Sequence, residues 1–417
     1  MRLSRTRGAK RVSARLSLAL ALLAGAAHAE PRLVVWMVGD DKVTQVLTPA
    51  VQAFKLGHPG VAVEVRDVPW ADAMSKYSAA LASRTGPDLI TGGTSFGIDL
   101  GAKGALIDLN QRAPDLVKLL TQYAVPGALR SVRRPDGVMH AAPFDMHLQL
   151  QFYRTDLLAK APRTYDEFDA AVRQLQAKGA RGYAQQWGNT NWLGFFPYLL
   201  QSGGALYDAQ CTKALVDSPE AVRALNYYAS VYRELKASTD TWPDADGGLE
   251  SGTTPLIQSG TWQLSALDIT RRKIIGRWAA APLPVGPTGR NTAFVGGTVL
   301  GVTTFSPHVD LALDFMRTVY RADVTRQMMA AAMVVGQVWL PGGRADQLDA
   351  LPLAPAHKQA LLTQLKDTEG PPNCAGWQRL SESLTRAVQR VVLADGDAQQ
   401  ELSKAALKMN RALQGGR

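Results

Sequence analysis

Leu33-Val34-Val35-Trp36-Met37 is an apolar run of the length of one buried strand, and it opens the stretch of sequence that decides the fold. Apolar residues then recur on one face of a helix that begins near Val43, and residues 61–65 alternate as a second strand. A helical segment at 71–83 and a strand at 87–91 follow. This β-α-β-α-β order predicts an α/β fold with a mostly parallel sheet flanked by helices.

The loops that follow these strands are the first candidates for a binding site. In open parallel sheets, ligands bind in the crevice at the carboxyl ends of the strands. This rule selects Gly39-Asp40-Asp41 after the first strand and Gly92-Gly93-Thr94-Ser95 after the third. A helix N-cap uses the same place in the chain, so capping remains the alternative role for Asp40 and Asp41.

The first 29 residues have the features of a cleavable secretory signal. Six Lys and Arg side chains precede an apolar run from Leu16 to Ala27, and Ala27-His28-Ala29 has the small residues of a cleavage site. The run of about twelve residues is too short to cross a bilayer of ~30 Å. No cysteine near Glu30 could accept a lipid. We therefore expect a soluble periplasmic protein that is not a lipoprotein.

The charge of the mature chain argues against nucleic acid as a partner. Loss of the signal removes six basic residues and no acidic one, which lowers the formal net charge from +10 to +4. The remaining basic residues are interspersed with acidic residues and form no run beside aromatic residues. The chain also has no phosphate-binding loop of the G-x-x-x-x-G-K type, so we expect no ATP hydrolysis, and we expect no cofactor.

The chain contains two cysteines, Cys211 and Cys374. A periplasmic location permits a disulfide between them, and closing so long a loop would stabilise the fold by roughly 4 to 5 kcal/mol in the chain-entropy model. Two buried thiols are the alternative, because a sequence does not give the distance between the two Cα atoms.

The mature chain of about 390 residues is too long for one core, which favours two lobes. A series of short motifs runs along it: residues 53–65 with the turn at Pro59, Gly86-Pro87-Asp88-Leu89, residues 104–109, residues 137–158, Ser259-Gly260-Thr261-Trp262, residues 282–286 and Val295-Gly296-Gly297. In this order they resemble the extracellular solute-binding proteins of ABC importers, specifically the sugar-binding group that includes maltose-binding protein.

The resemblance implies a type II periplasmic binding protein fold with two lobes, each a mostly parallel sheet flanked by helices, and three crossings between them. A ligand is held in the cleft as the lobes close by hinge motion. It implies crossings near Ala142, Pro282 and Thr318, which would put both cysteines in one lobe and so favour the disulfide. The implied domains are the signal peptide at 1–29, an N-terminal lobe of 30–142 plus 283–318, and a C-terminal lobe of 143–282 plus 319–417.

The resemblance also implies the function: capture of a mono- or oligosaccharide, delivery to inner-membrane permease subunits driven by a separate ATPase, and no catalysis. The binding protein is expected to be a monomer. A sugar offers a flat face of C–H bonds to aromatic rings and a rim of hydroxyls to polar groups. The implied ligand-binding residues are Trp36, Asp40, Asp41, Ser95, Asp145, His147, Asn191, Trp192, Trp262, Gly297 and Trp377.

Individual candidates differ in what supports them. Trp262 stands where the family has a tryptophan that stacks on sugar, and His147 stands where maltodextrin-binding relatives have an acid. Trp187 and Trp339 are weaker candidates. We assign Trp70, Trp242 and Trp278 to packing.

Three other functions remain open. A polyol phosphate would need cations in the cleft, for which Arg130, Arg133 and Arg379 are available. Residues 93–97 match the G-x-S-x-G motif of serine hydrolases with Ser95 as nucleophile, although two glycines in 98–104 make a poor helix start. Neither His308 nor His357 is singled out as the base of such an enzyme.

A metal site is the third alternative. His140, Asp145 and His147 could supply nitrogen and oxygen ligands close together in the sequence. Pro143 between them imposes an extended chain, which disfavours a compact ligand set.

Overall fold

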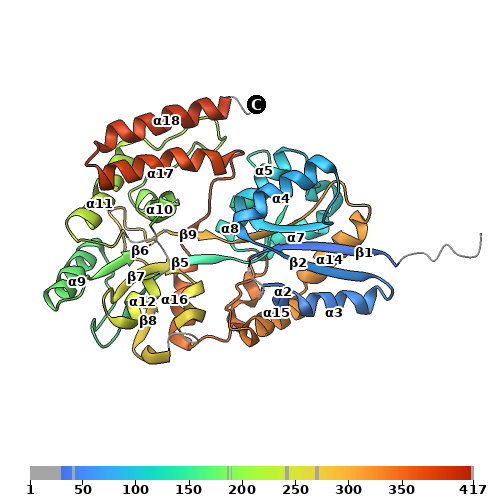
Figure 1. Ribbon diagram of the computed structural model, residues 1–417, viewed down its shortest axis with the longest axis horizontal. Coiled ribbons are helices and arrows are strands. Elements are labelled where there is room, and N and C mark those ends of the chain that lie inside the picture. Colours follow the sequence, from blue (N-terminus) through green and yellow to red (C-terminus); the bar gives the residue numbers. More distant parts are fainter. Residues whose placement is uncertain are drawn as a thin grey trace, which may run out of the picture.

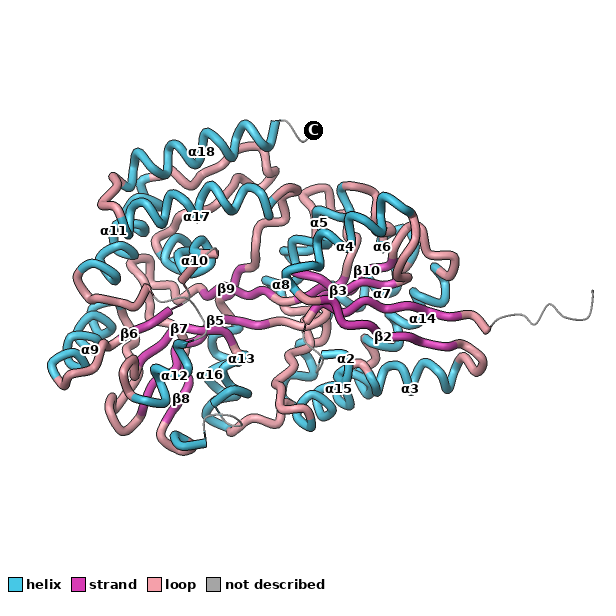
Figure 2. Tube along the Cα trace, viewed as in Figure 1, coloured by secondary structure: helices cyan, strands magenta, loops and turns pink. Residues whose placement is uncertain are grey.

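The structure is a computed structural model in which two lobes lie side by side (Figures 1 and 2). It describes residues 30–39, 43–185, 187–188, 190–239, 244–267 and 272–414. The predicted signal peptide lies outside these ranges. No helix within them is long and apolar enough to span a membrane.

The first lobe is built on a five-stranded sheet with the order β2-β1-β3-β10-β4. Its strands are β1 (Arg32–Val38), β2 (Ala62–Val68), β3 (Leu89–Gly93), β4 (Ala142–Pro143) and β10 (Thr298–Val302). β1 pairs in parallel with both β2 and β3, which confirms the predicted β-α-β-α-β start, whereas β10 pairs antiparallel with β3 and β4.

The helices of this lobe pack on both faces of the sheet (Figure 1). They are α2 (Val43–Val46), α3 (Thr48–Gly57), α4 (Trp70–Ser83), α5 (Thr94–Ala102), α6 (Leu109–Arg112), α7 (Pro114–Tyr123), α8 (Pro126–Val132), α14 (Val309–Val319), α15 (Ala322–Val334) and the 3-10 helix η3 (Ala345–Ala350). Leu33, Val35 and Met37 of β1 are buried beneath them in the core.

The second lobe contains a six-stranded sheet, and our prediction that this sheet is mostly parallel is wrong. Its strands are β5 (His147–Arg154), β6 (Tyr183–Gln185), β7 (Leu256–Gly260), β8 (Trp278–Ala281), β9 (Ala293–Gly296) and β11 (Thr368–Glu369). The central strand β5 runs antiparallel to β7, β8 and β9, and only the β6–β7 and β9–β11 pairs are parallel. β5 runs away from the first lobe and β9 runs back toward it, so these two neighbouring strands lie antiparallel.

The helices of the second lobe include the two that cover one side of it, α17 and α18 (Figure 1). The full set is α9 (Tyr165–Ala177), α10 (Asn191–Gln201), α11 (Pro219–Arg233), α12 (Asp244–Ser251), α13 (Trp262–Ser265), the 3-10 helix η2 (Arg272–Ile274), α16 (Pro355–Leu365), α17 (Trp377–Leu393) and α18 (Ala398–Gln414).

Capping residues in the sequence predict three helix starts, at Thr164, Ser218-Pro219 and Ser306-Pro307, and two of them are confirmed. The Thr164 and Ser218 hydroxyls accept from backbone N–H groups in the first turns of α9 and α11. The third prediction, a helix starting at Pro307, is wrong: α14 begins at Val309. The Ser306 hydroxyl instead donates to Asp88 and accepts from the His308 N–H, which holds this segment in a turn.

The chain crosses between the lobes at places that differ in part from our prediction. The first crossing lies between β4 and β5, next to the predicted Ala142. The second lies at Gly297, not near Pro282, because β9 still belongs to the second sheet. The third lies between η3 and α16, not near Thr318, because α15 packs on α2 and α3 of the first lobe.

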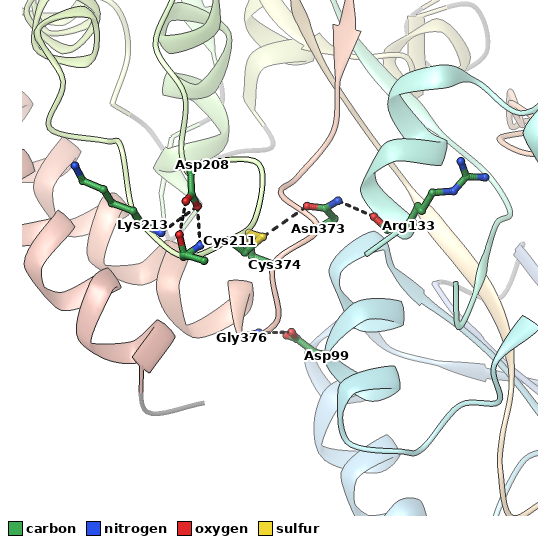
Figure 3. Close-up of a disulfide and its surroundings, with 9 residues drawn as sticks. Asp99, Arg133, Asp208, Cys211, Lys213, Asn373, Cys374 and Gly376 are labelled. Carbon is green, nitrogen blue, oxygen red and sulfur yellow. Dashed lines mark hydrogen bonds between the residues drawn. A yellow bond between two sulfur atoms is a disulfide. The ribbon is translucent and has the colours of Figure 1, made fainter. Parts of the chain in front are cut away.

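Cys211 and Cys374 form a disulfide with their Cα atoms 5.5 Å apart (Figure 3). Cys211 lies in the loop between α10 and α11, and Cys374 lies just before α17. The bond therefore ties two parts of the second lobe that are 163 residues apart in the sequence.

The second crossing depends on a glycine. Gly297 has φ of 156°, and a Cβ atom there would lie 2.3 Å from the Asp145 carbonyl oxygen of the first crossing. We predict that Gly297→Ala lowers the free energy of unfolding by about 2 to 4 kcal/mol, measured by urea denaturation. Gly57→Ala is the control, because a Cβ at this last residue of α3 meets no atom within 4 Å. Equal stability of both variants would contradict the tight crossing.

Candidate functional site

A cleft of about 640 Å³ lies between the lobes. The first lobe contributes Trp70 at the start of α4 and Gly93, Thr94 and Ser95 at the junction of β3 and α5. These residues follow the carboxyl ends of β2 and β3, where the sheet topology predicts a ligand crevice. The second crossing forms part of the floor with Gly296 and Gly297.

Aromatic rings from both lobes face this cleft. Trp70 comes from the first lobe and is 53 % exposed. Trp192 and Phe294 come from the second lobe, with their ring centroids 5.7 Å apart and nearly perpendicular. Trp377 stands edge-on to Trp192 at 4.9 Å and is itself buried, so it fixes the position of Trp192.

One face of α17 supplies most of the polar groups of the cleft. Its lining side chains are Ser381, Glu382, Thr385, Arg386 and Gln389. Their spacing places them on adjacent turns of the same helical face. Arg386 lies 3.5 Å from Glu382, and both side chains are exposed. The helix therefore brings hydroxyl, carboxylate, guanidinium and amide groups to one wall of the cleft.

α5 forms although we predicted that its glycines would disfavour a helix. Its glycines are required by packing: a Cβ at Gly101 would lie 2.4 Å from the His140 ring, and one at Gly97 would lie 3.0 Å from Ala141. The missing side chains let α5 approach the crossing strand closely, which brings Ser95 to the edge of the cleft.

Four of the residues predicted from the sequence line the cleft together: Ser95, Trp192, Gly297 and Trp377. Trp36 does not, because its half-buried ring stacks on Tyr77 inside the first lobe. Asn191 is fully buried, and its side-chain oxygen accepts from the Gly188 N–H, so it shapes the start of α10. Asp40 and Asp41 lie outside the described residues.

Asp145, His147 and Trp262 form a separate group at the first crossing. The Asp145 carboxylate accepts from the Thr298 N–H at 2.7 Å, which joins the two crossings. The His147 Nδ1 atom is 3.2 Å from the Thr261 hydroxyl, and its ring meets Trp262 edge-on at 5.5 Å. Trp262 is 37 % exposed and lies over Gly260.

Trp70 was missed because we assigned it to packing. The sequence did indicate a place in the cleft for Trp70, because this residue follows the second strand of the parallel sheet. Ligands of such sheets bind at the carboxyl ends of the strands. The polar face of α17 was also missed. Trp187 and Trp339, the weaker ligand-binding candidates, are buried against Tyr232 and Phe144 and are not among the lining residues of the cleft. Trp278 stacks on His357, in keeping with its assignment to packing. Trp242 is outside the described residues.

The residues of the alternative functions do not meet in the cleft. Arg130 and Arg133 line a second hollow of about 400 Å³, and Arg379 lines a third of about 570 Å³. His308 is the N-cap residue of α14 and His357 packs on Trp278, and neither is among the lining residues near Ser95. The ring of His140 is bonded to the Leu106 and Ile107 carbonyls. Within the described ranges, no three His, Cys, Asp or Glu side chains are grouped to hold a metal.

Burial lowers the pKa of His147, and the negative charge of Asp145 acts against this shift without reversing it. Below about pH 6.5 the unfolded chain therefore binds a proton that the folded protein resists. Above pH 6.5 His147 is neutral in both the folded and the unfolded chain, so it costs the folded protein no stability. We predict that the free energy of unfolding decreases as the pH falls from 6.5 toward the lowered pKa, because the unfolded chain is then stabilised by protonation. His147→Gln should make the melting temperature fall less between pH 6.5 and 5. His308→Gln is the control, and an equal effect of both variants would contradict the prediction.

Comparison with known proteins identifies the class. Residues 49–336 match the family described as bacterial extracellular solute-binding protein, and the chain belongs to this family. This confirms the resemblance seen in the sequence.

Individual relatives and solved structures agree with this assignment. The lactose-binding protein of Rhizobium radiobacter is 25 % identical over 338 residues, which cover 75 % of this chain and 76 % of that one. The cyclic alpha-maltosyl-1,6-maltose binding protein of Arthrobacter globiformis has a TM-score of 0.79 and 22 % identity over 92 % of this chain and all of that one. A maltose-bound T. maritima protein has a TM-score of 0.74 and 25 % identity over 91 % of this chain and 99 % of that one.

Proposed function

We propose that the protein captures a mono- or oligosaccharide in the interlobe cleft. The observation that carries this proposal is the pairing of Trp70 on one lobe with Trp192 and Phe294 on the other, beside the polar face of α17. Rings on two sides suit the C–H faces of a sugar, and the α17 side chains suit its hydroxyls. The cleft volume lies within the range of small-molecule sites.

The relatives support the same ligand class. The lactose-binding relative and the structures that bind maltose and a cyclic maltosyl-maltose are all named for carbohydrates. We propose further that the loaded protein works in the periplasm after removal of residues 1–29, as a free protein without a lipid. It would deliver the sugar to the permease subunits of an ABC importer and catalyse no reaction itself.

A thermal-shift screen of the mature protein tests the ligand class. A ligand that binds only the folded state stabilises it by mass action and so raises the melting temperature. At a ligand concentration one hundred times the Kd, the stabilisation is about 2.7 kcal/mol. We expect a rise with particular mono- or oligosaccharides and none with amino acids or divalent metals. A response to polyol phosphates alone would overturn the carbohydrate assignment and leave the family assignment intact.

Trp70 is the sharpest test of the site. Trp70→Ala should weaken sugar binding by roughly 1 to 3 kcal/mol, because one stacking face is lost without leaving a buried polar group unsatisfied. The melting temperature should change little, since the ring is half exposed. Isothermal titration calorimetry with the sugar from the screen measures the change. Trp278→Phe, outside the cleft, serves as the control and should bind like the parent protein; unchanged affinity of Trp70→Ala would remove this ring from the site.

A further inference from the structure

A small cavity lies inside the second lobe, apart from the interlobe cleft. Its volume is about 10 Å³, which is about the least that holds one water molecule. Strands β5, β6 and β7 and helices α9, α10 and α11 all contribute lining residues. Among the described residues, none lines both this cavity and the interlobe cleft. The cavity is therefore a feature of the second lobe's own core.

Two glutamines from neighbouring strands face this cavity. Gln151 of β5 and Gln258 of β7 stand directly opposite each other in the antiparallel pair, so both side chains lie on the same face of the sheet. Gln151 is 3 % exposed and Gln258 is 6 % exposed. Amide groups at such depth need hydrogen-bond partners for both nitrogen and oxygen, because an unpaired buried polar atom costs stability.

The Gln151 amide is satisfied at its nitrogen. This atom donates to the carbonyl oxygens of Pro162 and Pro282 at 2.7 and 2.5 Å, which uses both of its protons and fixes the orientation of the amide. The Oε1 atom of Gln151 is buried and has no hydrogen-bond partner among the described residues. The cavity therefore meets an acceptor on the side of β5.

The Gln258 amide is satisfied at its oxygen. This Oε1 atom accepts from the Tyr183 hydroxyl at 3.2 Å. The Nε2 atom of Gln258 is buried and lacks a hydrogen-bond partner within the described ranges. The cavity therefore meets a donor on the side of β7. Each amide is held by its other contacts, so this donor and the Gln151 acceptor face one cavity without bonding to each other.

We propose that the cavity is a binding site for one structural water molecule, which accepts from Gln258 Nε2 and donates to Gln151 Oε1. A buried water makes about three hydrogen bonds, and two tyrosines that also line the cavity supply the third. The hydroxyl groups of Tyr165 and Tyr198 donate to the side-chain oxygens of Gln201 and Gln185, at 2.7 and 3.4 Å, so their own oxygen atoms can still accept.

The polar atoms at this site select water over other small occupants. A cation would be repelled by the N–H group of Gln258, and an anion would be repelled by the oxygen of Gln151. An apolar guest would leave both atoms unpaired. Water supplies a donor and an acceptor at once, and in this place it links β5 to β7. This site is independent of the ligand that we propose for the interlobe cleft.

A crystal structure of the mature protein tests the site directly. The map must show other buried waters, which serve as the internal control. We expect one peak of solvent density within about 2.7 to 3.2 Å of both Gln151 Oε1 and Gln258 Nε2. A map without density at this place, or a direct bond between the two amides, would overturn the proposal.

A double-mutant cycle measures whether the two glutamines act together. Methionine has the length of glutamine but does not hold a water, so Gln151→Met and Gln258→Met are made singly and together. The bonds to Pro162, Pro282 and Tyr183 are lost equally in the single and double variants, and these losses cancel in the cycle. Each single variant already breaks the water bridge. We therefore expect the urea midpoint to fall less in the double variant than the sum of the two single shifts.

Gln149 supplies the matched control. It lies two residues before Gln151 on the same face of β5, and its Oε1 atom likewise has no partner in the part of the chain that the structure describes, but it does not line the cavity. Diagonal neighbours in a sheet are about 7 to 8 Å apart, so Gln149→Met and Gln258→Met should give additive shifts. Additive shifts in both cycles would contradict a shared water. If a methionine variant fails to fold, the crystal structure of the parent protein still decides.

Discussion

The close approach of two crossing strands at Gly297 is the constraint on which the architecture depends. The second crossing passes so near the Asp145 backbone that no Cβ atom fits, and the Asp145 carboxylate accepts from the N–H of Thr298 just beyond it. Both sheets take strands from these crossings, β5 and β9 on one side and β4 and β10 on the other. The lobes are therefore joined at a narrow ordered point, and the cleft opens where their sheets end.

The chemistry of the cleft follows from what lies at those sheet ends. The parallel strands β2 and β3 point their carboxyl ends at the cleft and deliver Trp70 and Ser95 there. On the second lobe, α10, β9 and α17 line the opposite side of the cleft and bring aromatic and polar groups from distant parts of the sequence. The lining of the cleft is therefore shared between the two lobes, with most of the polar groups on the second.

Local patterns in the sequence predicted the local structure well. The alternation and apolar runs of residues 33–91 predicted β1, α4, β2 and β3, because burial on a sheet imposes these periods directly. The strand-end rule predicted Ser95 as a cleft residue, and the family resemblance predicted Trp192, Gly297 and Trp377. Trp70 obeyed the same rule and was still missed, because a tryptophan is more often a packing residue. The α17 face could not be predicted, since nothing local says which polar side of an amphipathic helix meets solvent and which meets a ligand.

The crossings were harder to place than the strands. β9 and α15 read as an ordinary strand and helix in the sequence, and only their partners, β5 and α3, decide to which lobe they belong. These are contacts between residues far apart in the chain, which one sequence does not reveal. For the same reason the sequence alone did not decide between a disulfide and two free thiols. In the structure the two cysteines are bonded, with their Cα atoms 5.5 Å apart.

The position of β10 sets the order in which the molecule can be assembled. This strand lies between β3 and β4 in the first sheet, yet it is made more than 150 residues after β4. The first lobe therefore cannot complete its sheet until most of the chain has been synthesised, and the second lobe in turn waits for β11 and α17. Such dependence on distant contacts slows folding. Until β10 is made, the edges of β3 and β4 that it will cover have no strand beside them.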